Sequence, residues 1–572
     1  MTQDGLTLYY TVLEIKDQII GCKVDKIHQP KPDTIVLGLR APAKNPRLLI
    51  CAGASDSRLH LTARKYENPK FPPSFCMFLR KHISGAKVAA VEQTGLERIV
   101  TITLQAKDEL GLTRNITLIA ELMGKHSNIM LVKDEIIMDS MRRVTSSQSR
   151  VRSVLPGLAY KTPRSDKLNP LHISRSTLIE MLKKRGGANI KTYLSSFLAG
   201  LSGQSADEIL YRYLPLGYKE QPKEAERLSD IILGFFSESP KPVIYLSGKV
   251  PFFYSPFRFA GIAAEPVGYN SFNSMVDDYY AGISLHLAFA AKRGRLSRIT
   301  EKQLEKQIAT LQKQQVSAQM AKKADIHKMR GDIITANIYR ITKGQRILAA
   351  SDYATGADIA IELDTRVSPA ANAQRQYKRY SKLKAGLDVT LRRIKETQND
   401  IVFLESVLHS LDLSESECEL AEIEYELFKA GFMPRRQANA SITKTPSKPH
   451  KFISSDGYTI YAGKNNRQND LLTMKTAEPD DIWLHTKDIP GSHVLITGAR
   501  GMASDIALLE AAKIAATLSK AKNGAKVRVD YAPRKNVRKP NGAKPGMVVY
   551  EGHSSILVSP DKTLLERLKS EQ

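Results

Sequence analysis

Two long helical segments between Ser271 and Gly431, separated by a short insert, constrain the fold of this chain more than any other feature. In the second segment, apolar residues recur at steps of three, four or seven with charged or amide residues between them, the pattern of a coiled-coil seam. They are Tyr380, Leu383, Leu387, Ile394, Ile401, Leu404, Leu408 and Leu411. The first segment has a poorer seam of Leu304, Ile308, Leu311 and Ala318. The two segments are therefore predicted to fold back on each other.

A helix of roughly 40 residues is about 60 Å long, so this hairpin is predicted to form an arm over residues 271–431. Arg346–Ser351 and Asp358–Leu363 have the pattern of two short strands, and Ser368-Pro369 restarts the helix. The arm is thus expected to end in a small tip near residues 340–368. A helical hairpin can be a dimerisation device or an intramolecular spacer, and the globular sequence on both sides favours the spacer.

The residues before the arm predict an α+β module, assigned to residues 1–170. Leu6–Ile20 and Ser74–Ile83 have helical patterns, whereas segments of alternating hydrophobicity between Pro, Gly and Asn turns predict strands. The predicted strands are Lys23–Gln29, Thr34–Leu39, Arg47–Ala52, Lys87–Gln93, Arg98–Leu104, Arg114–Glu121, Asn128–Val132 and Glu135–Met141. Strands this closely spaced favour a barrel or a sandwich.

A glycine-containing connection between two helices follows the first module. Lys191–Leu198 and Ala206–Leu214 are predicted helices, and Ala199–Gly203 joins them. This is the order of a helix-hairpin-helix, in which glycines let backbone N–H groups approach a phosphate. With a single copy, a plain helical connector explains the pattern as well. The segment is assigned to residues 171–222, and residues 223–270 connect it to the arm.

The charge of the chain points to a polyanionic partner. Lys and Arg number 85 and Asp and Glu 59, so the formal net charge at pH 7 is +26. Such a surplus favours nucleic acid first and a membrane surface second. There is no apolar run of about eighteen residues and no signal-like N-terminus, so we expect a cytoplasmic chain without a membrane partner. The cysteines lack zinc-site spacing, and neither a metal nor a cofactor is predicted.

The last module, residues 451–565, follows a polar linker at residues 441–450 and contains one predicted helix, Ser504–Lys520. Trp483 and His485 are two positions apart and so lie on one face of a strand. There they could stack an RNA base between an indole and an imidazole. A buried Trp beside a hydrogen-bonded His is the structural alternative, and on these two residues alone it is preferred.

A basic loop in this module changes the balance towards RNA. Tyr531–Gly546 carries Arg and Lys residues but no acidic residue, and the string Gly463–Asp470 adds Asn and Arg side chains of a usually exposed kind. Such a loop is suited to follow phosphates, although a solvated surface is the ordinary alternative. The RNA-binding candidates are Trp483, His485, His493, Arg534, Lys535, Arg538, Lys539 and Lys544.

Glu97 and Arg98 stand where a turn, Thr94-Gly95-Leu96, enters a predicted strand. Neighbours on a regular strand point to opposite faces, so both side chains can meet one ligand only from the turn itself or from a bulge. A solvated hairpin end is the usual explanation for such a pair, and on spacing alone it is preferred.

The order of modules and several strings resemble the NFACT family of ribosome-associated quality-control factors, and the resemblance spans nearly the whole chain. Its most specific strings are Asp481-x-Trp483-x-His485, Pro490-Gly491-Ser492-His493-Val494, Lys535-Asn536-Val537-Arg538-Lys539-Pro540 and Gly542-Ala543-Lys544-Pro545-Gly546. Supporting strings are Glu121–Asn128, Leu363-Asp364, Ser368-Pro369 and Asn372-Ala373-Gln374.

The resemblance implies a non-catalytic adaptor that binds large ribosomal subunits carrying peptidyl-tRNA and recruits alanyl-tRNA. The stalled chain would be extended with alanine without a template and so marked for degradation. The family's acidic–basic pair for tRNA binding falls on Glu97 and Arg98, where the first residue is Glu instead of the usual Asp. The extra methylene moves the carboxylate by roughly 1–1.5 Å. Binding of tRNA is therefore expected, while the detailed base contact is left open.

The resemblance also extends to the N-terminal domain of formamidopyrimidine-type DNA glycosylases. Those enzymes use an N-terminal Pro amine and an adjacent Glu, whereas Thr2 and Gln3 stand here, so that activity is not expected. The runner-up function is a surface adhesin for host matrix, a label some relatives carry. The predicted fold class is α+β multidomain: a β-rich N-terminal module resembling the glycosylase fold, a helix-hairpin-helix segment, a long antiparallel coiled-coil arm with a small tip, and a C-terminal α+β RNA-binding module.

Overall fold

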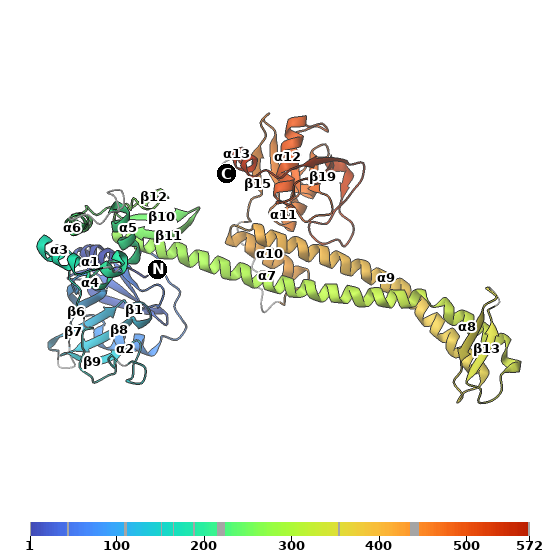
Figure 1. Ribbon diagram of the computed structural model, residues 1–572, viewed down its shortest axis with the longest axis horizontal. Coiled ribbons are helices and arrows are strands. Elements are labelled where there is room, and N and C mark those ends of the chain that lie inside the picture. Colours follow the sequence, from blue (N-terminus) through green and yellow to red (C-terminus); the bar gives the residue numbers. More distant parts are fainter. Residues whose placement is uncertain are drawn as a thin grey trace. The chain divides into compact units, whose positions relative to one another are not determined.

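The computed structural model describes residues 2–42, 45–107, 111–149, 151–163, 165–186, 189–213, 224–352, 355–434 and 446–569 (Figure 1). The chain divides into two compact units, Met1–Leu287 and Ala288–Gln572. The boundary falls inside one continuous helix, α7 (Phe272–Lys322). Both units mix helices with strands, as the sequence predicts. Among the described residues, no helix is both long enough and apolar enough to cross a bilayer.

One nine-stranded antiparallel sheet dominates the first unit, in the order β4-β3-β2-β1-β5-β6-β7-β8-β9. Its strands are β1 (Lys23–Lys31), β2 (Thr34–Arg40), β3 (Arg47–Cys51), β4 (Arg58–Leu61), β5 (Lys87–Gln93), β6 (Ile99–Lys107), β7 (Thr113–Glu121), β8 (Asn128–Lys133) and β9 (Ile136–Ser140). The sequence missed β4 because Arg58 and His60, both buried, interrupt its apolar pattern. All nine strands belong to one sheet, in which β1 and β5 join through a single residue pair, Lys23 with Lys87, and the choice between a barrel and a sandwich stays a prediction.

Two helices cover the core of this sheet. α1 (Gly5–Ile19) lies against β4 and β5, and α2 (Ser74–Ile83) reaches β1, β6 and β9. Contact of one helix with strands so far apart in the order shows that the sheet is strongly curled. The side chain of Asp4 caps α1 by accepting from the Thr7 N–H at 2.7 Å. Leu8, Val12 and Ile15 are buried one helical turn apart, which directs a single face of α1 into the core.

A second core of the first unit lies among four helices and a small sheet. The elements are α3 (Arg175–Lys183), α4 (Ile190–Phe197), α5 (Gly203–Tyr213), α6 (Glu224–Phe236), β10 (Val243–Ser247), β11 (Val250–Ser255) and β12 (Pro266–Gly268). Leu6 of α1 and Leu96 of the β5–β6 turn are buried in this core. The predicted helical segment therefore packs directly on the first module. Leu214, the last residue of the predicted second helix, lies outside the described residues.

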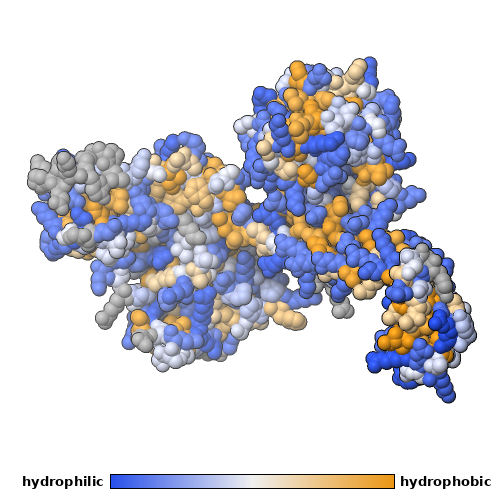
Figure 2. Space-filling model, turned by 45° about the vertical axis from the view of Figure 1, so that its right-hand side comes forward, coloured by the Kyte–Doolittle hydropathy of each residue, from blue (hydrophilic) through white to orange (hydrophobic). Residues whose placement is uncertain are grey.

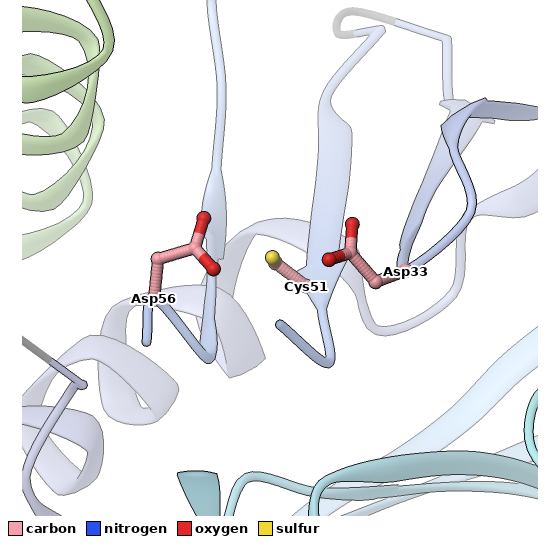
Figure 3. Close-up of side chains that lie close together, drawn as sticks. All are labelled: Asp33, Cys51 and Asp56. Atoms are coloured by element: carbon pink, nitrogen blue, oxygen red, sulfur yellow. The ribbon is translucent and has the colours of Figure 1, made fainter. Parts of the chain in front are cut away.

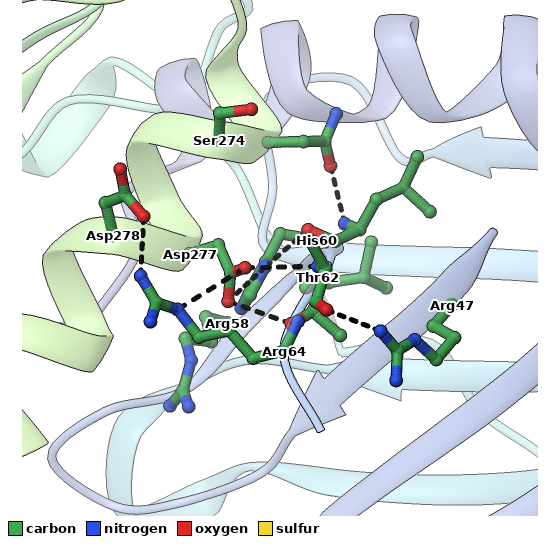
Figure 4. Close-up of polar contacts among 12 residues, drawn as sticks. Arg47, Arg58, His60, Thr62, Arg64, Ser274, Asp277 and Asp278 are labelled. Atoms are coloured by element: carbon green, nitrogen blue, oxygen red, sulfur yellow. Dashed lines mark hydrogen bonds and ion pairs between the residues drawn. The ribbon is translucent and has the colours of Figure 1, made fainter. Parts of the chain in front are cut away.

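The start of α7 is held by hydrogen bonds to α1 and to the end of β4, and Figure 4 shows the contacts of Asp277 with Thr62 and its neighbours. Glu14 accepts from the backbone N–H groups of Phe272 and Asn273 at 2.7 and 3.1 Å. Asp277 accepts from the Thr62 hydroxyl at 2.9 Å, beside His60, whose pKa burial lowers to about 3. His60 is therefore neutral at physiological pH, and the first turns of α7 belong structurally to the first unit.

The second unit contains the predicted helical hairpin (Figure 1). α7 runs antiparallel to α9 (Pro369–Leu413), and between them lie α8 (Asp325–Ala336) and the two-stranded sheet of β13 (Ile347–Ser351) and β14 (Asp358–Glu362). The long helix fits an arm, and α8, β13 and β14 form its tip around a small apolar core. The visible face of the tip shows apolar side chains bordered by hydrophilic ones (Figure 2).

The seam between the helices is more polar than the sequence predicts. All eight expected residues of α9 are buried or half-buried. On α7, Leu304, Leu311 and Ala318 are at least half-buried, but Ile308 is 42% exposed, and its assignment to the seam is wrong. The second heptad position that faces α9 lies one residue before Ile308, at Gln307. Its residues, all buried or half-buried, are Thr300, Gln307, Gln314 and Ala321.

The C-terminal module is a six-stranded antiparallel sheet in the order β15-β16-β18-β17-β19-β22. Its strands are β15 (His450–Ile453), β16 (Thr459–Ala462), β17 (Ile482–Thr486), β18 (Val494–Thr497), β19 (Val527–Pro533) and β22 (Ser554–Val558), with β20 (Val537–Arg538) paired to β21 (Val549–Tyr550). Its helices are α11 (Asn466–Leu471), α12 (Asp505–Thr517) and α13 (Lys562–Leu568). α10 (Glu417–Lys429) lies between the arm and this module, and residues 441–445 of the predicted linker are outside the described residues.

Candidate nucleic-acid interface

Glu97 and Arg98 lie in the turn between β5 and β6, because β6 begins at Ile99 and not at Arg98 as predicted. The Glu97 N–H donates to the Thr94 carbonyl at 2.9 Å, and the Gln93 side chain donates to the Glu97 carbonyl at 2.9 Å. Both charged side chains are half-buried. The geometric condition for two neighbours to reach one ligand is therefore met.

A polar cavity of about 460 Å³ contains both side chains. Its lining comes from the start of the chain, the β5–β6 turn, Lys167 and the hairpin before α5. The lining residues are Thr2, Asp4, Gly5, Leu96, Glu97, Arg98, Lys167, Gly200, Leu201, Ser202, Gly203 and Gln204. Two sequence features that were weak when read separately, the charged pair and the glycine hairpin, thus belong to one site.

Glycine is needed where these segments meet. A Cβ on Gly5 would lie 2.0 Å from the carbonyl oxygen of Leu96 and 2.7 Å from the Cα of Gly200. Gly200 has a φ of +75°, and a Cβ there would lie 2.8 Å from that of Leu96. The predicted role of the hairpin glycines was approach to a phosphate, whereas Gly200 here allows close approach to Leu96. Phosphate contact by the hairpin stays a prediction.

Charges of both signs meet at this cavity. Arg98 Nη1 donates to Thr2 Oγ1 at 3.3 Å, which uses one of the five N–H donors of the guanidinium. Glu97 Oε1 accepts from the Ser165 hydroxyl at 2.5 Å. Burial raises the pKa of Asp4, while hydrogen bonds from Thr7 and Ser202 and the charge of Arg98 oppose that shift. In the sequence, the only indication of a role for Asp4 is its position before an amphipathic helix. Nothing in the sequence indicates a role for Lys167, which lies in a loop.

Trp483 lies in the interior of the C-terminal module, with 0% of its surface exposed. The His485 ring stacks on it at a centroid distance of 5.9 Å, and the His493 ring meets it edge-on at 5.2 Å. Burial lowers the pKa of His485 to about 4 and that of His493 well below its usual range. Both imidazoles are therefore neutral at physiological pH. Trp483 is thus a buried Trp beside a His, the structural alternative given by the sequence. A contact of Trp483 with RNA stays a prediction.

The five cations of the basic loop all have protein partners. Arg534 donates to the Thr473 carbonyl at 2.7 Å, and Lys539 and Lys544 pair with Asp470 and Asp400. These three side chains are at most half-exposed and fasten the loop to the module and to α9. Lys535 and Arg538 remain accessible to a phosphate. Their side chains are well exposed, and each pairs with an exposed carboxylate, Lys535 with Asp480 and Arg538 with Glu551.

The string Gly463–Asp470 faces α10 instead of solvent. Three carboxylates on one face of α10 accept hydrogen bonds from three consecutive residues of the string. The pairs are Lys464–Glu419, Asn465–Glu422 and Asn466–Glu426, at 2.9, 2.7 and 2.7 Å. Burial raises the pKa of Glu426 to about 8, with the hydrogen bond from Asn466 opposing the shift. The usually exposed Asn residues of this string thus serve to dock the module on the arm.

Asp33, Cys51 and Asp56 present oxygen and sulfur atoms within 4.8 Å of one another (Figure 3). The Thr34 hydroxyl lies 3.0 Å from Asp33 and 3.5 Å from the Cys51 sulfur, and Arg58 pairs with Asp56 at 3.0 Å. Burial raises the pKa of the Cys51 thiol. The side chains of Thr34 and Arg58 thus supply protein partners for Asp33, Cys51 and Asp56. We do not assign a metal site to these three residues.

Comparison with known proteins covers almost the entire chain. Residues 4–446 match the family described as NFACT N-terminal and middle domains, and residues 448–556 match the NFACT protein RNA binding domain. The chain is 33% identical to the Rqc2 homolog RqcH of Bacillus subtilis and 35% identical to that of Streptococcus pneumoniae, over the full length of each. A solved C-terminal structure of the fibronectin/fibrinogen-binding protein from Streptococcus suis is 33% identical, covers 49% of this chain and 99% of its own, and has a TM-score of 0.40.

Proposed function

The chain belongs to the NFACT family, and on this premise we propose that it is an adaptor in ribosome quality control. It binds large ribosomal subunits that carry peptidyl-tRNA and recruits tRNA, with alanyl-tRNA as the expected species. The ribosome then adds alanine to the stalled chain without a template, and the tail marks the chain for degradation. Support comes from the full-length similarity to proteins named RqcH, the matched RNA-binding domain and the net charge of +26.

The observation that carries this proposal is the cavity that joins Glu97 and Arg98 to the Gly200–Gly203 hairpin. Arg98 can pair with a phosphate or a guanine edge, and Glu97 can accept from base amino groups, which an unpaired RNA loop presents freely. Backbone N–H groups of the hairpin can add phosphate contacts. The cavity thus offers contacts to both the bases and the backbone of a tRNA loop.

In this proposal the protein is not an enzyme. Peptidyl transfer is left to ribosomal RNA, and the protein positions substrates in the cytoplasm, where stalled subunits are found. Its contribution is binding and orientation, which need complementary charge and shape but no nucleophile or general base.

Purification of the full chain from its own cells tests the proposal. We expect it to cosediment with large subunits in a sucrose gradient, and sequencing of the copurified RNA to show tRNA with alanine acceptors enriched. A chain confined to the cell-wall fraction, free of subunits and tRNA, would overturn the proposal in favour of an adhesin.

A further inference from the structure

The sheet of the C-terminal module has two unlike faces. One face packs on α12 through Leu484, Val529 and other apolar residues of the module core. The register pairs His485 with Asp530 and Asp530 with Ser555, and it pairs Arg528 with Leu557. Because side chains alternate along a strand, these five residues lie on the face opposite α12. We call them, together with Tyr550 and His553, the outer sheet face.

Asp530 organises the outer sheet face from below. Its carboxylate is 0% exposed and accepts from the Tyr550 hydroxyl at 2.9 Å and from the Ser555 hydroxyl at 2.6 Å. Arg528 Nε and His553 Nε2 lie 3.6 and 3.7 Å from the same carboxylate. One buried acid therefore fixes two rings, a hydroxyl and a guanidinium in a single arrangement.

The groups that Asp530 fixes are open to solvent on their other side. The side chain of Arg528 is 54% exposed and that of His553 33% exposed, and Leu557 is 58% exposed. The His553 ring meets the Tyr550 ring edge-on at 5.1 Å, and Tyr550 in turn packs on Trp483 at 4.9 Å. The buried Trp483 thus supports the rings that a ligand can touch.

We propose that the outer sheet face binds single-stranded RNA, with a base against His553 and Tyr550 and a phosphate on Arg528. A flat sheet surface that combines accessible rings, an apolar side chain and a guanidinium suits an unpaired nucleotide, because every base has a face to stack and every linkage carries a charge. A duplex buries its base faces and cannot use the rings. This inference deepens the proposed function, since it rests on the RNA-binding role of this module.

Fluorescence anisotropy of the full chain with a labelled oligouridine tests the inference. Loss of one stacked base costs roughly five- to a hundredfold in affinity, so we expect His553→Ala to weaken binding within that range and His553→Phe to restore most of it. Arg528→Gln should flatten the slope of log affinity against log salt by about 0.7, the value for one single-strand phosphate contact. Uridine crosslinks should map to residues 549–555.

Controls separate this inference from the function as a whole. Arg500→Gln removes the same charge from an exposed turn before α12 and should leave binding unchanged. Trp483 is the only Trp, so its unaltered emission in His553→Ala shows that the module is intact. Wild-type affinity in both His553→Ala and Arg528→Gln, or no oligouridine binding by the wild type, would overturn the inference. Copurification of tRNA and subunits by the same proteins would leave the adaptor role standing.

Discussion

Glu97 and Arg98 are held only lightly by the rest of the protein. Within the described residues their side chains donate or accept one hydrogen bond each, Glu97 with Ser165 and Arg98 with Thr2. We therefore expect Glu97→Ala and Arg98→Ala to melt within about 1 kcal/mol of wild type. Loss of a charged hydrogen bond to a base costs roughly 1–3 kcal/mol of binding free energy. The amount of copurified tRNA should therefore fall, while binding to the large subunit should not change. If both variants retain tRNA, the pair is not part of the site.

Glu97→Asp is the sharper probe of the same site. The Glu97 carboxylate reaches the Ser165 hydroxyl, and a side chain shorter by roughly 1–1.5 Å would no longer reach it. We expect Asp to bind tRNA more weakly than Glu in this chain, measured as tRNA recovered per mole of protein. Equal recovery would show that the position needs only a carboxylate.

Glu426 gives the docking of the C-terminal module a pH dependence. Its pKa is raised from 4.5 to about 8, so the folded chain binds a proton more tightly than the unfolded chain. The contribution of Glu426 to stability is therefore greatest below about pH 4.5, falls as pH rises to about 8, and is level above that. We expect Glu426→Gln to remove this dependence and to raise the free energy of unfolding near pH 8 by on the order of 1–3 kcal/mol. Urea titrations followed by Trp483 emission measure it, and a variant less stable than wild type at that pH contradicts it.

At the scale of elements, the arm carries a polar heptad position along α7. Gln314 Oε1 is buried and lacks a hydrogen-bond partner within the described part of the chain. We expect Gln314→Leu to raise the unfolding free energy by about 1 kcal/mol, because it removes an unsatisfied acceptor and adds apolar burial. Gln315→Leu, on the exposed neighbouring position, is the matched control and should not stabilise the chain. Equal melting curves for Gln314→Leu and wild type would count against a packed seam at this point.

The tip is the element we expect to contact the large subunit. It exposes Tyr339 by 83% and Ile347 by 54%, together with Arg346. Replacement of residues 346–363 by a short Gly/Ser turn should weaken cosedimentation with large subunits and leave binding of free tRNA intact, since the Glu97–Arg98 cavity is untouched. Unchanged cosedimentation would refute the assignment.

Periodicity was enough to locate most elements, and it failed where side chains broke it. The helical hairpin, α1, α2 and most strands follow from apolar spacing, but β4 does not. Its buried Arg58 and His60 lie beside Tyr280 and Asp277, which only the fold brings near. Ile308 was placed one residue from the true seam because Gln307 gives no apolar signal. The string Gly463–Asp470 looked exposed for a similar reason: its partners on α10 are some 40 residues away.

For the whole molecule, the charge surplus of +26 overstates the number of free cations. Of the basic loop, only Lys535 and Arg538 combine well-exposed side chains with exposed ion pairs. We expect the double variant Lys535→Gln, Arg538→Gln to keep the stability of wild type. The slope of log RNA affinity against log salt should flatten by about 0.7–0.9 for each phosphate that is no longer neutralised. Neutralising Arg534 or Lys539 instead should destabilise the module, because both hold internal partners. A wild-type salt slope in the double variant would show that the loop is not on RNA.

The order of modules and the charged pair could be inferred from the sequence, and the site they form could not. The predicted domain boundaries stay predictions, whereas the two compact units divide inside α7. The cavity draws on Thr2, Arg98, Lys167 and Ser202, which are distant in sequence and share no motif. The close approach that Gly5 and Gly200 permit is one of the contacts that bring them together.

The polar heptad position of α7 has a further consequence while the chain is being synthesised. α7 ends at Lys322, before the first residue of α9 at Pro369 has been added, so the helix must wait for its partner as part of a nascent chain. With Leu at Thr300, Gln307 and Gln314, two nascent copies on one messenger RNA could zip together through a strong apolar seam. We expect the amide and hydroxyl side chains to weaken such premature pairing, at a cost in the stability of the finished arm.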